Sequence, residues 1–388
     1  MNSHDASWAA DATRGRPGIG LVLRRSFAAL VIVAMVGAVV VAIVRNASGP
    51  AEIAAPATTP AAVGDAAWWP DYARVLQYLN IPGDDRPYDP FGPLRLRDLT
   101  STYVNVVDGS RRTWTPPDCD GCRRLTVWMY GGSTTFGIGQ RDDQTIASQL
   151  ARLAWKDGIA LDVRNRGVPA DMHWEEAQRF AWDAAADPAP DLVIFYDGTN
   201  EMWASSVLNA KGWGDDESQW NPETENARET YRDLIHTAPG FVDRAAPDGV
   251  ELRPDKEFTA TRLGPEELAV HVLHRYEKSL SISRAVADAH HLATEWFWQP
   301  CPQSGTHVEG EPNASREDLD RNLALCRATA ASLPAGVTDL SRTFDGRTRP
   351  LFIDAFHTSE AGATVAATAL LDRLRPTIDG LLDGRPPS

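Results

Sequence analysis

Two short apolar runs constrain the fold of this chain most strongly. The run LTVWMY (125–130) predicts a buried strand, and DLVIFYDG (191–198) is typical of a central strand in a parallel sheet. Between them, apolar residues at helical spacing predict helices, and IALDV (159–163) predicts a further short strand. Strands that alternate with helices indicate an α/β fold in which crossover helices join parallel strands.

The alternation of predicted strands and helices is less clear after the second run, and it is clear again toward the C-terminus. Residues 265–292 predict a long helix, 294–300 a strand and 315–332 another helix. The segment LFIDAFHTSEAGATVAATALLDRL (351–374) predicts a short strand, a turn and a C-terminal helix. The long stretch 202–290 between strands predicts an insertion or cap.

Glycine and polar residues stand where the predicted strands end. Ser133 follows two glycines after the first strand, Gly167 lies in the loop after the second, and Asn200 follows Gly-Thr after the third. In open parallel sheets, ligands bind at this edge. Asp354 and His357 come much later, in the turn before the last helix. We expect these five residues to form one site.

The chemistry of these groups suits ester hydrolysis. The Ser133 hydroxyl becomes a nucleophile when a base takes its proton, and His357 can do so near neutral pH. Asp354 can orient that imidazole and stabilise its positive form. An attacked carbonyl becomes an oxyanion, which the N–H groups of Ser133 and Gly167 and the amide of Asn200 can stabilise. The sequence predicts a Ser-His-Asp triad with a three-donor oxyanion hole.

The order of these motifs resembles the SGNH hydrolases, also called GDSL esterases or lipases. The matching blocks are GGSTTFG (131–137), NRG (165–167), GTNE (198–201) and DAFH (354–357). The resemblance implies a three-layer α/β/α sandwich with a mostly parallel, flavodoxin-like sheet. It also implies the same catalytic roles for the five residues, and no metal or organic cofactor.

Two positions depart from the family pattern. Gly132 replaces the Asp of the GDS motif, and Glu201 replaces the Asp of GxND. Neither position carries the family's core chemistry, so we interpret both as tolerated variation. The resemblance covers roughly 125–201 and 290–375, and it leaves 67–124 and the insertion unexplained.

Simpler interpretations exist for most of these features. The segment GGSTTFG lacks the Gly-Lys-Ser/Thr of a phosphate loop. Asn200 could cap a turn, and His357 could be structural at a helix start. We interpret six further histidines as surface or packing residues, namely His173, His271, His274, His290, His291 and His307. The tryptophans of the insertion either pack a small core or offer a platform for a sugar ring, namely Trp203, Trp213 and Trp220.

An uncharged apolar stretch of 18 residues, 27–44, lies near the N-terminus. As a helix it spans about 27 Å, close to the thickness of a bilayer's hydrocarbon core. Arginines precede it, and no Lys or Arg occurs between Arg45 and Arg74. The positive-inside rule then places the N-terminus in the cytoplasm. A cleaved signal peptide, which would make the protein secreted, is the alternative.

These features predict the organisation of the whole chain. Residues 1–25 are the cytoplasmic N-terminus, 26–45 a single transmembrane anchor and 46–66 an Ala/Pro-rich linker. Residues 67–388 form the extracytoplasmic hydrolase domain at the cell membrane.

The four cysteines fit an exported domain. Cys119 and Cys122 form CDGC in a Pro/Asp-rich loop, whereas Cys301 and Cys326 lie 25 residues apart. The second pair lacks zinc-ligand spacing, and no nearby histidine pair completes four ligands. We therefore expect the disulfides Cys119–Cys122 and Cys301–Cys326.

The formal net charge of −15, from 53 acidic and 38 basic residues, makes a nucleic-acid partner unexpected. The sequence predicts a membrane-anchored serine esterase that removes short acyl groups, such as acetyl, from a carbohydrate or cell-envelope glycan. The alternatives are an O-acyltransferase with the same triad, a lipid esterase and a non-catalytic glycan-binding protein.

Overall fold

The computed structural model describes residues 60, 62–63, 66–79, 96–210, 262–302, 304, 316–347 and 350–384. The chain divides into two compact units, Met1–Ala55 and Pro56–Ser388, and every described residue belongs to the second. The predicted anchor (26–45) lies outside the described residues, as do Trp213, Trp220 and His307. None of the helices in the described ranges is both long and apolar enough to cross a membrane.

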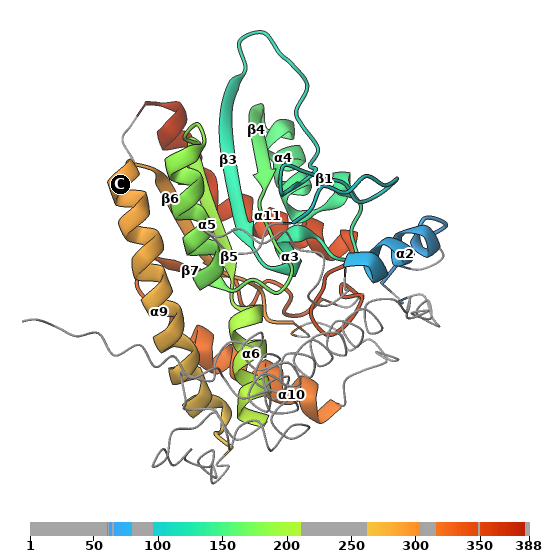
Figure 1. Ribbon diagram of the computed structural model, residues 1–388, viewed down its shortest axis with the longest axis vertical. Coiled ribbons are helices and arrows are strands. Elements are labelled where there is room, and N and C mark those ends of the chain that lie inside the picture. Colours follow the sequence, from blue (N-terminus) through green and yellow to red (C-terminus); the bar gives the residue numbers. More distant parts are fainter. Residues whose placement is uncertain are drawn as a thin grey trace, which may run out of the picture. The chain divides into compact units, whose positions relative to one another are not determined.

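A seven-stranded sheet forms the centre of the fold, in the order β1-β2-β4-β3-β5-β6-β7 (Figure 1). Its strands are β1 (Val106–Val107), β2 (Ser110–Arg111), β3 (Arg123–Gly131), β4 (Ile159–Asn165), β5 (Leu192–Asp197), β6 (Ala293–Trp298) and β7 (Val337–Asp339). Strands β3 to β7 are parallel to one another, and their order is that of flavodoxin-like sheets. The short β1–β2 hairpin joins β4 in antiparallel fashion. The predicted α/β class and mostly parallel sheet are confirmed.

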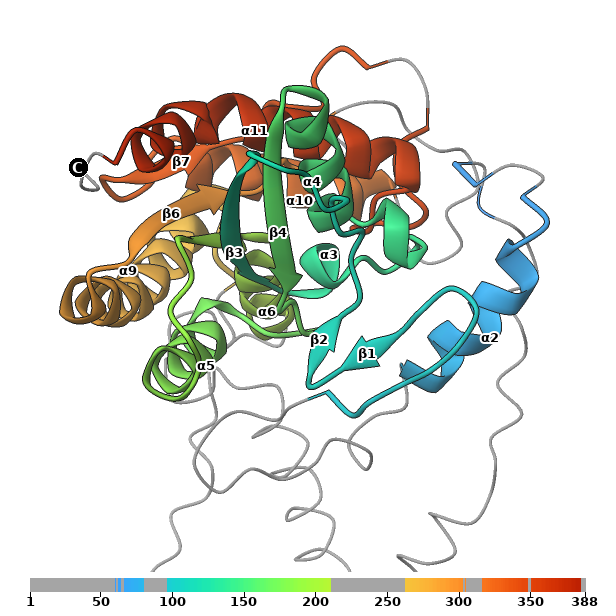
Figure 2. The same cartoon turned by 90° about the horizontal axis from the view of Figure 1, so that it is seen from above.

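Helices cover both faces of the sheet (Figure 2). Helices α4 (Ile146–Lys156) and α11 (Glu360–Leu382) pack on one face, and α5 (His173–Ala186) and α9 (Pro265–His290) pack on the other. Side chains alternate along β3: Val127 and Met129 join the first core, and Trp128 and Tyr130 join the second. The remaining described elements are α2 (Trp69–Leu79), α3 (Ser133–Phe136), the 3-10 turn Asp142–Gln144, α6 (Thr199–Ala210) and α10 (Arg316–Ala330).

Helix α9 changes the limits of the predicted insertion, 202–290. It packs along α5 in the helical layer, with Leu268, Val272 and Leu280 in a buried cluster. It is therefore the crossover between β5 and β6 and belongs to the sandwich. The part of the insertion from 211 to 261 lies outside the described residues.

The predicted strand at 351–353 is wrong. The fifth parallel strand is β7, and Leu351–Ile353 instead folds back on the residues that follow it. The Ile353 N–H donates to the His357 carbonyl, and the Ser359 N–H donates to the Leu351 carbonyl, both at 2.8 Å. These apolar residues are buried in a tight loop, which local pattern alone does not distinguish from a strand.

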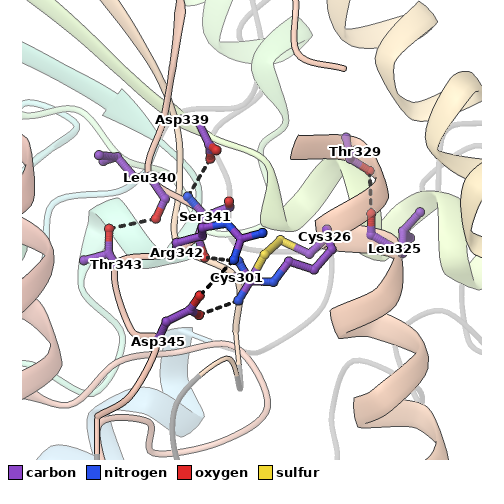
Figure 3. Close-up of a disulfide and its surroundings, with 11 residues drawn as sticks. Cys301, Leu325, Cys326, Thr329, Asp339, Leu340, Ser341, Arg342, Thr343 and Asp345 are labelled. Carbon is purple, nitrogen blue, oxygen red and sulfur yellow. Dashed lines mark hydrogen bonds and ion pairs between the residues drawn. A yellow bond between two sulfur atoms is a disulfide. The ribbon is translucent and has the colours of Figure 1, made fainter. Parts of the chain in front are cut away.

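Both predicted disulfides are present. The Cys301–Cys326 bond joins the segment after β6 to α10 (Figure 3). The Cys301 N–H also donates to the Ser341 carbonyl at 3.0 Å, and Arg327 pairs with Asp345 nearby. The covalent bond and these polar contacts hold α10 against the end of the sheet.

We expect removal of the Cys301–Cys326 bond by a double alanine substitution to lower the free energy of unfolding by about 3 kcal/mol. The bond closes a separation of 25 residues and so restricts the unfolded chain. Denaturant unfolding of the double variant measures the loss. The matched control is the double alanine variant of Cys119 and Cys122, which are only 3 residues apart and should show a smaller loss. An equal loss in both would contradict this explanation.

Candidate active site

Three of the predicted residues form one hydrogen-bonded chain. The Nε2 atom of His357 lies 2.8 Å from the Oγ atom of Ser133, 224 residues earlier in the sequence. The Nδ1 atom of His357 lies 2.7 Å from Oδ2 of Asp354. Both distances are typical of hydrogen bonds, and the arrangement places a base between a nucleophile and an orienting carboxylate.

A tight turn before α11 holds the base. The other carboxylate oxygen of Asp354 accepts the backbone N–H groups of Phe356 at 2.8 Å and His357 at 2.7 Å. Burial opposes ionisation of Asp354, but the charge of His357 and these hydrogen bonds hold the pKa of Asp354 below its ordinary value. Asp354 is therefore an anion that can stabilise a protonated imidazole.

The amide of Asn200 lies against the residue before the nucleophile. A Cβ atom added to Gly132 would be 2.1 Å from Nδ2 of Asn200, which shows how closely the two residues approach. That nitrogen donates to the Asp171 carbonyl at 2.5 Å. As the first residue of α3, Ser133 has a backbone N–H without an intrahelical partner. The Asn200 amide thus lies against Gly132, the residue next to Ser133, and the donor roles of Ser133 and Asn200 stay predictions.

The N–H of Gly167, the third predicted oxyanion donor, donates to Oδ1 of Asn165 at 3.0 Å. Its role as an oxyanion donor stays a prediction. An added Cβ would be 2.4 Å from the backbone nitrogen of Phe136. A side chain does not fit at this position, because the residues after β4 pack directly against the backbone of α3, the helix that begins with Ser133.

Ala170 is a candidate donor that the sequence analysis missed. It has φ of 69° in the turn Val168–Asp171, which the Asp171 N–H closes on the Val168 carbonyl at 3.1 Å. A non-glycine residue in this left-handed region carries strain of the kind that is common at functional sites. Within the described ranges its N–H has no hydrogen-bond acceptor, and the next residue, Asp171, contacts Asn200. Pro169 marks the turn in the sequence, but nothing there marks Ala170.

The interpretation of His173 as a surface or packing residue overlooked a buried polar network. Its Nδ1 atom lies 2.7 Å from Asp197 at the end of β5, and its Nε2 atom lies 2.9 Å from Ser283 on α9. This repeats the order Ser-His-Asp, but the His173 side chain is only 1% exposed. Its burial keeps substrate away from this histidine. Its hydrogen bonds instead join α5 to α9 and to the end of β5.

Glu201 connects this network to the candidate site. Its carboxylate accepts the N–H of His173 at 2.7 Å and the N–H of Gly198 at 2.8 Å. It thereby joins the first residue of α5 to Gly198, which lies directly before α6, the helix that carries Asn200. Burial and the charge of Asp197 raise the pKa of Glu201 to about 7, against the lowering effect of backbone N–H groups that include those of His173 and Gly198.

One group of described residues could offer ligands to a metal ion. Donor atoms of His173, Glu176 and Asp197 all lie within 4.8 Å of one another. Both ring nitrogens of His173 already have partners. Burial and the charge of Asp197 raise the pKa of Glu176 well above its ordinary value, which favours the neutral form of this carboxyl group.

We expect the free energy of unfolding to fall as the pH rises from about 5 to about 8. The folded-state pKa of Glu201, about 7, exceeds its ordinary value of 4.5, so the folded protein binds this proton more tightly than the unfolded chain does. This proton adds roughly 3 kcal/mol to the free energy of unfolding at a pH below the pKa of Glu201 in the unfolded chain. That contribution is lost at a pH above its pKa in the folded protein. Urea unfolding across this range measures it, and Glu201→Gln should show a flatter pH profile. A wild-type stability that rises over the same interval would contradict the assignment.

Comparison with known proteins finds no matching family model and no matching curated protein. Several solved structures resemble the chain. One is a putative lipolytic protein of the G-D-S-L family from Desulfitobacterium hafniense, with 14% identity, 63% of this chain and 97% of that chain covered, and a TM-score of 0.32. Another is a carbohydrate acetylesterase family member from Sinorhizobium meliloti, with 16% identity, 66% and 99% covered, and a TM-score of 0.33. A third is the acetyl xylan esterase AlAXEase, with 13% identity, 64% and 100% covered, and a TM-score of 0.35.

The first of these proteins belongs to the G-D-S-L family, which the sequence motifs resemble, and the other two are named as esterases that act on acetylated carbohydrate. Their identities and TM-scores are too low to carry an argument about the function of this chain. We therefore base the function on the geometry of Ser133, His357 and Asp354.

Proposed function

We propose that this chain is an SGNH-type serine ester hydrolase that removes short acyl groups from an acylated carbohydrate. One observation carries the proposal: a hydrogen-bonded chain from Ser133 through His357 to Asp354, with the Asn200 amide beside the nucleophile. Binding alone does not require this arrangement, whereas acyl transfer does.

The geometry supports a two-step reaction. His357 takes the proton of Ser133 as Oγ attacks the ester carbonyl, and the carbonyl electron pair moves onto its oxygen. The Ser133 N–H and the Asn200 amide stabilise this oxyanion, each contributing about 2.7–4 kcal/mol. The intermediate expels the sugar alkoxide, which receives the proton from His357 and leaves an acyl-Ser133 ester. Water, deprotonated by His357, then attacks that ester and releases the acid.

Two exposed tryptophans support a carbohydrate substrate. Trp203 is 41% exposed and follows Asn200 by three residues, so the two lie on one face of α6. Trp174 is 36% exposed and follows His173, whose N–H is bound to Glu201 of α6. Exposed indole rings offer flat apolar faces on which a sugar ring can stack. A net charge of −15 also favours a neutral substrate over an anionic one.

We also propose that residues 26–45 anchor the protein in the cell membrane, with the catalytic domain outside the cytoplasm. The apolar stretch and the arginines before it support this orientation. The disulfides fit an oxidising compartment.

The test compares three substrates with the full-length protein: acetylated xylo-oligosaccharide, p-nitrophenyl acetate and p-nitrophenyl palmitate. We expect hydrolysis of both acetates and little of the palmitate. Trp203→Ala should raise KM for the oligosaccharide and leave KM for p-nitrophenyl acetate unchanged.

Other results would favour the alternatives. Activity confined to the palmitate would indicate a lipid esterase. Faster transfer of acetyl to an added sugar than to water would indicate an O-acyltransferase. An inert protein whose Ser133 does not react with a fluorophosphonate probe would be a glycan-binding protein.

A further inference from the structure

We propose that Tyr72 and Gln140 are positioning residues of the candidate triad, acting through the turn 137–140. This turn contacts the nucleophile's helix on one side and the loop of His357 on the other. Tyr72 lies on α2, in the part of the chain (67–124) that the family resemblance leaves unexplained. The inference rests on the proposed hydrolase function.

One buried hydroxyl holds the turn. The Tyr72 hydroxyl accepts the N–H groups of Gly139 at 2.6 Å and Gln140 at 3.1 Å, and it donates to the Gly137 carbonyl at 3.1 Å. A hydroxyl has one donor and two acceptor positions, so all three are used on this one turn. The Tyr72 side chain is fully buried, and burial raises its pKa, which keeps the hydroxyl able to donate.

A second residue from the same part of the chain holds the turn at both ends. The guanidinium of Arg111, on β2, donates to the Phe136 carbonyl at 3.2 Å and to the Gln140 carbonyl at 2.9 Å. Arg111 is 1% exposed. The segment before β3 therefore fixes the turn by two independent sets of hydrogen bonds.

The turn is bonded directly to the nucleophile. The N–H groups of Gly137 and Ile138 both donate to the Ser133 carbonyl, at 3.0 and 3.1 Å. Gly137 has φ of 90°, and an added Cβ would be 2.6 Å from a methyl carbon of Thr145. The turn thus ends α3 in a conformation that only glycine adopts readily.

The same turn is bonded to the loop of the base. The Gln140 side-chain amide donates to both the carbonyl and the hydroxyl of Thr358, the residue after His357, each at 2.9 Å. An added Cβ at Gly139 would be 2.3 Å from the end of Ile353, whose N–H donates to the His357 carbonyl at 2.8 Å. Gln140 is fully buried. The turn therefore contacts the base's loop at both of its ends.

These contacts determine the separation of Ser133 and His357. The two residues are 224 positions apart in the chain, and their 2.8 Å contact depends on how α3 and the loop 353–358 are held. A displacement of about 1 Å at reacting groups can reduce rate by about a hundredfold. Loosening the turn should therefore slow the chemical step and leave substrate binding nearly unchanged.

The experiment compares Tyr72→Phe and Gln140→Leu with Tyr130→Phe in the full-length protein. Tyr130→Phe is the matched control, because its hydroxyl is also buried and hydrogen-bonded, to Asp183 at 2.9 Å on the α5 side of the sheet. We expect kcat for p-nitrophenyl acetate to fall about 10- to 100-fold in the first two variants, with KM within twofold. Tyr130→Phe should lower the melting temperature but change kcat less than twofold. Unchanged kcat in Tyr72→Phe and Gln140→Leu, measured well below their melting temperatures, overturns the inference.

Hydrogen exchange adds a readout that does not depend on turnover. Peptides covering 133–142 and 351–360 should exchange faster in both test variants and at the wild-type rate in Tyr130→Phe. Unchanged exchange in 351–360 overturns the inference even if the enzyme is active. Absence of Ser133-dependent turnover in the wild-type protein refutes the proposed function instead, so the two failures are distinguishable.

Discussion

Replacing Ser133 or His357 with alanine should each lower kcat for p-nitrophenyl acetate by about 10⁴-fold or more. The alanine at 133 removes the nucleophile, and the alanine at 357 leaves a serine hydroxyl with no base to take its proton. His357 contacts both Ser133 and Asp354, so the three groups act as a unit. The double variant should consequently be no slower than either single variant.

Steady-state kinetics on the purified proteins test this prediction, with Ser148→Ala as the control. Ser148 is also a buried, hydrogen-bonded serine, but its hydroxyl donates to the Asp142 carbonyl at 2.6 Å and belongs to α4. That variant should keep its kcat within a few fold. Losses in the single variants that multiply in the double variant would show that Ser133 and His357 do not act together.

Gly132→Ala should lower kcat by about 10²- to 10³-fold in a folded protein, the loss expected for one oxyanion donor. The added methyl group would lie 2.1 Å from Nδ2 and 3.1 Å from Cγ of Asn200, so the amide must move away from the nucleophile. The added methyl group would also lie 3.1 Å from the Asp171 carbonyl, which accepts the Asn200 amide, so both contacts act against the present position of that amide.

Kinetics of Gly132→Ala beside Asn200→Ala test this explanation. The double variant should be no slower than Asn200→Ala, because both changes remove the same donor. Gly380→Ala in α11 is the control, since an added Cβ there meets nothing within 4 Å. Full activity in Gly132→Ala would show that the Asn200 amide is not needed where the structure places it.

The parallel core could be predicted because its strands are buried on both faces. All six residues of β5 are buried, and this burial makes its sequence an unbroken apolar run. Strand β7 has no such signal, because its three residues, Val337–Asp339, are only partly buried or exposed. The apolar segment 351–353 then offered a false alternative, since its burial comes from the loop around His357.

The triad could be predicted from residue type and order, but its surroundings could not. His173 looks like an ordinary helix residue until Asp197, Ser283 and Glu201 are brought to it from three other elements. Ala170 carries no signal because its left-handed backbone is imposed by the turn and not by its side chain. The predicted anchor and linker, which lie largely outside the described residues, stay predictions.

The two edge strands of the sheet affect how readily the protein aggregates at high concentration. One edge strand is β1, which has two residues, and the other is β7, which has three. A long exposed edge strand is a template on which another chain can add by backbone hydrogen bonds. Edge strands as short as these two offer few free N–H and C=O groups for such pairing. We therefore expect the folded domain to resist fibril-like aggregation at high local density, as on a surface that holds many tethered copies.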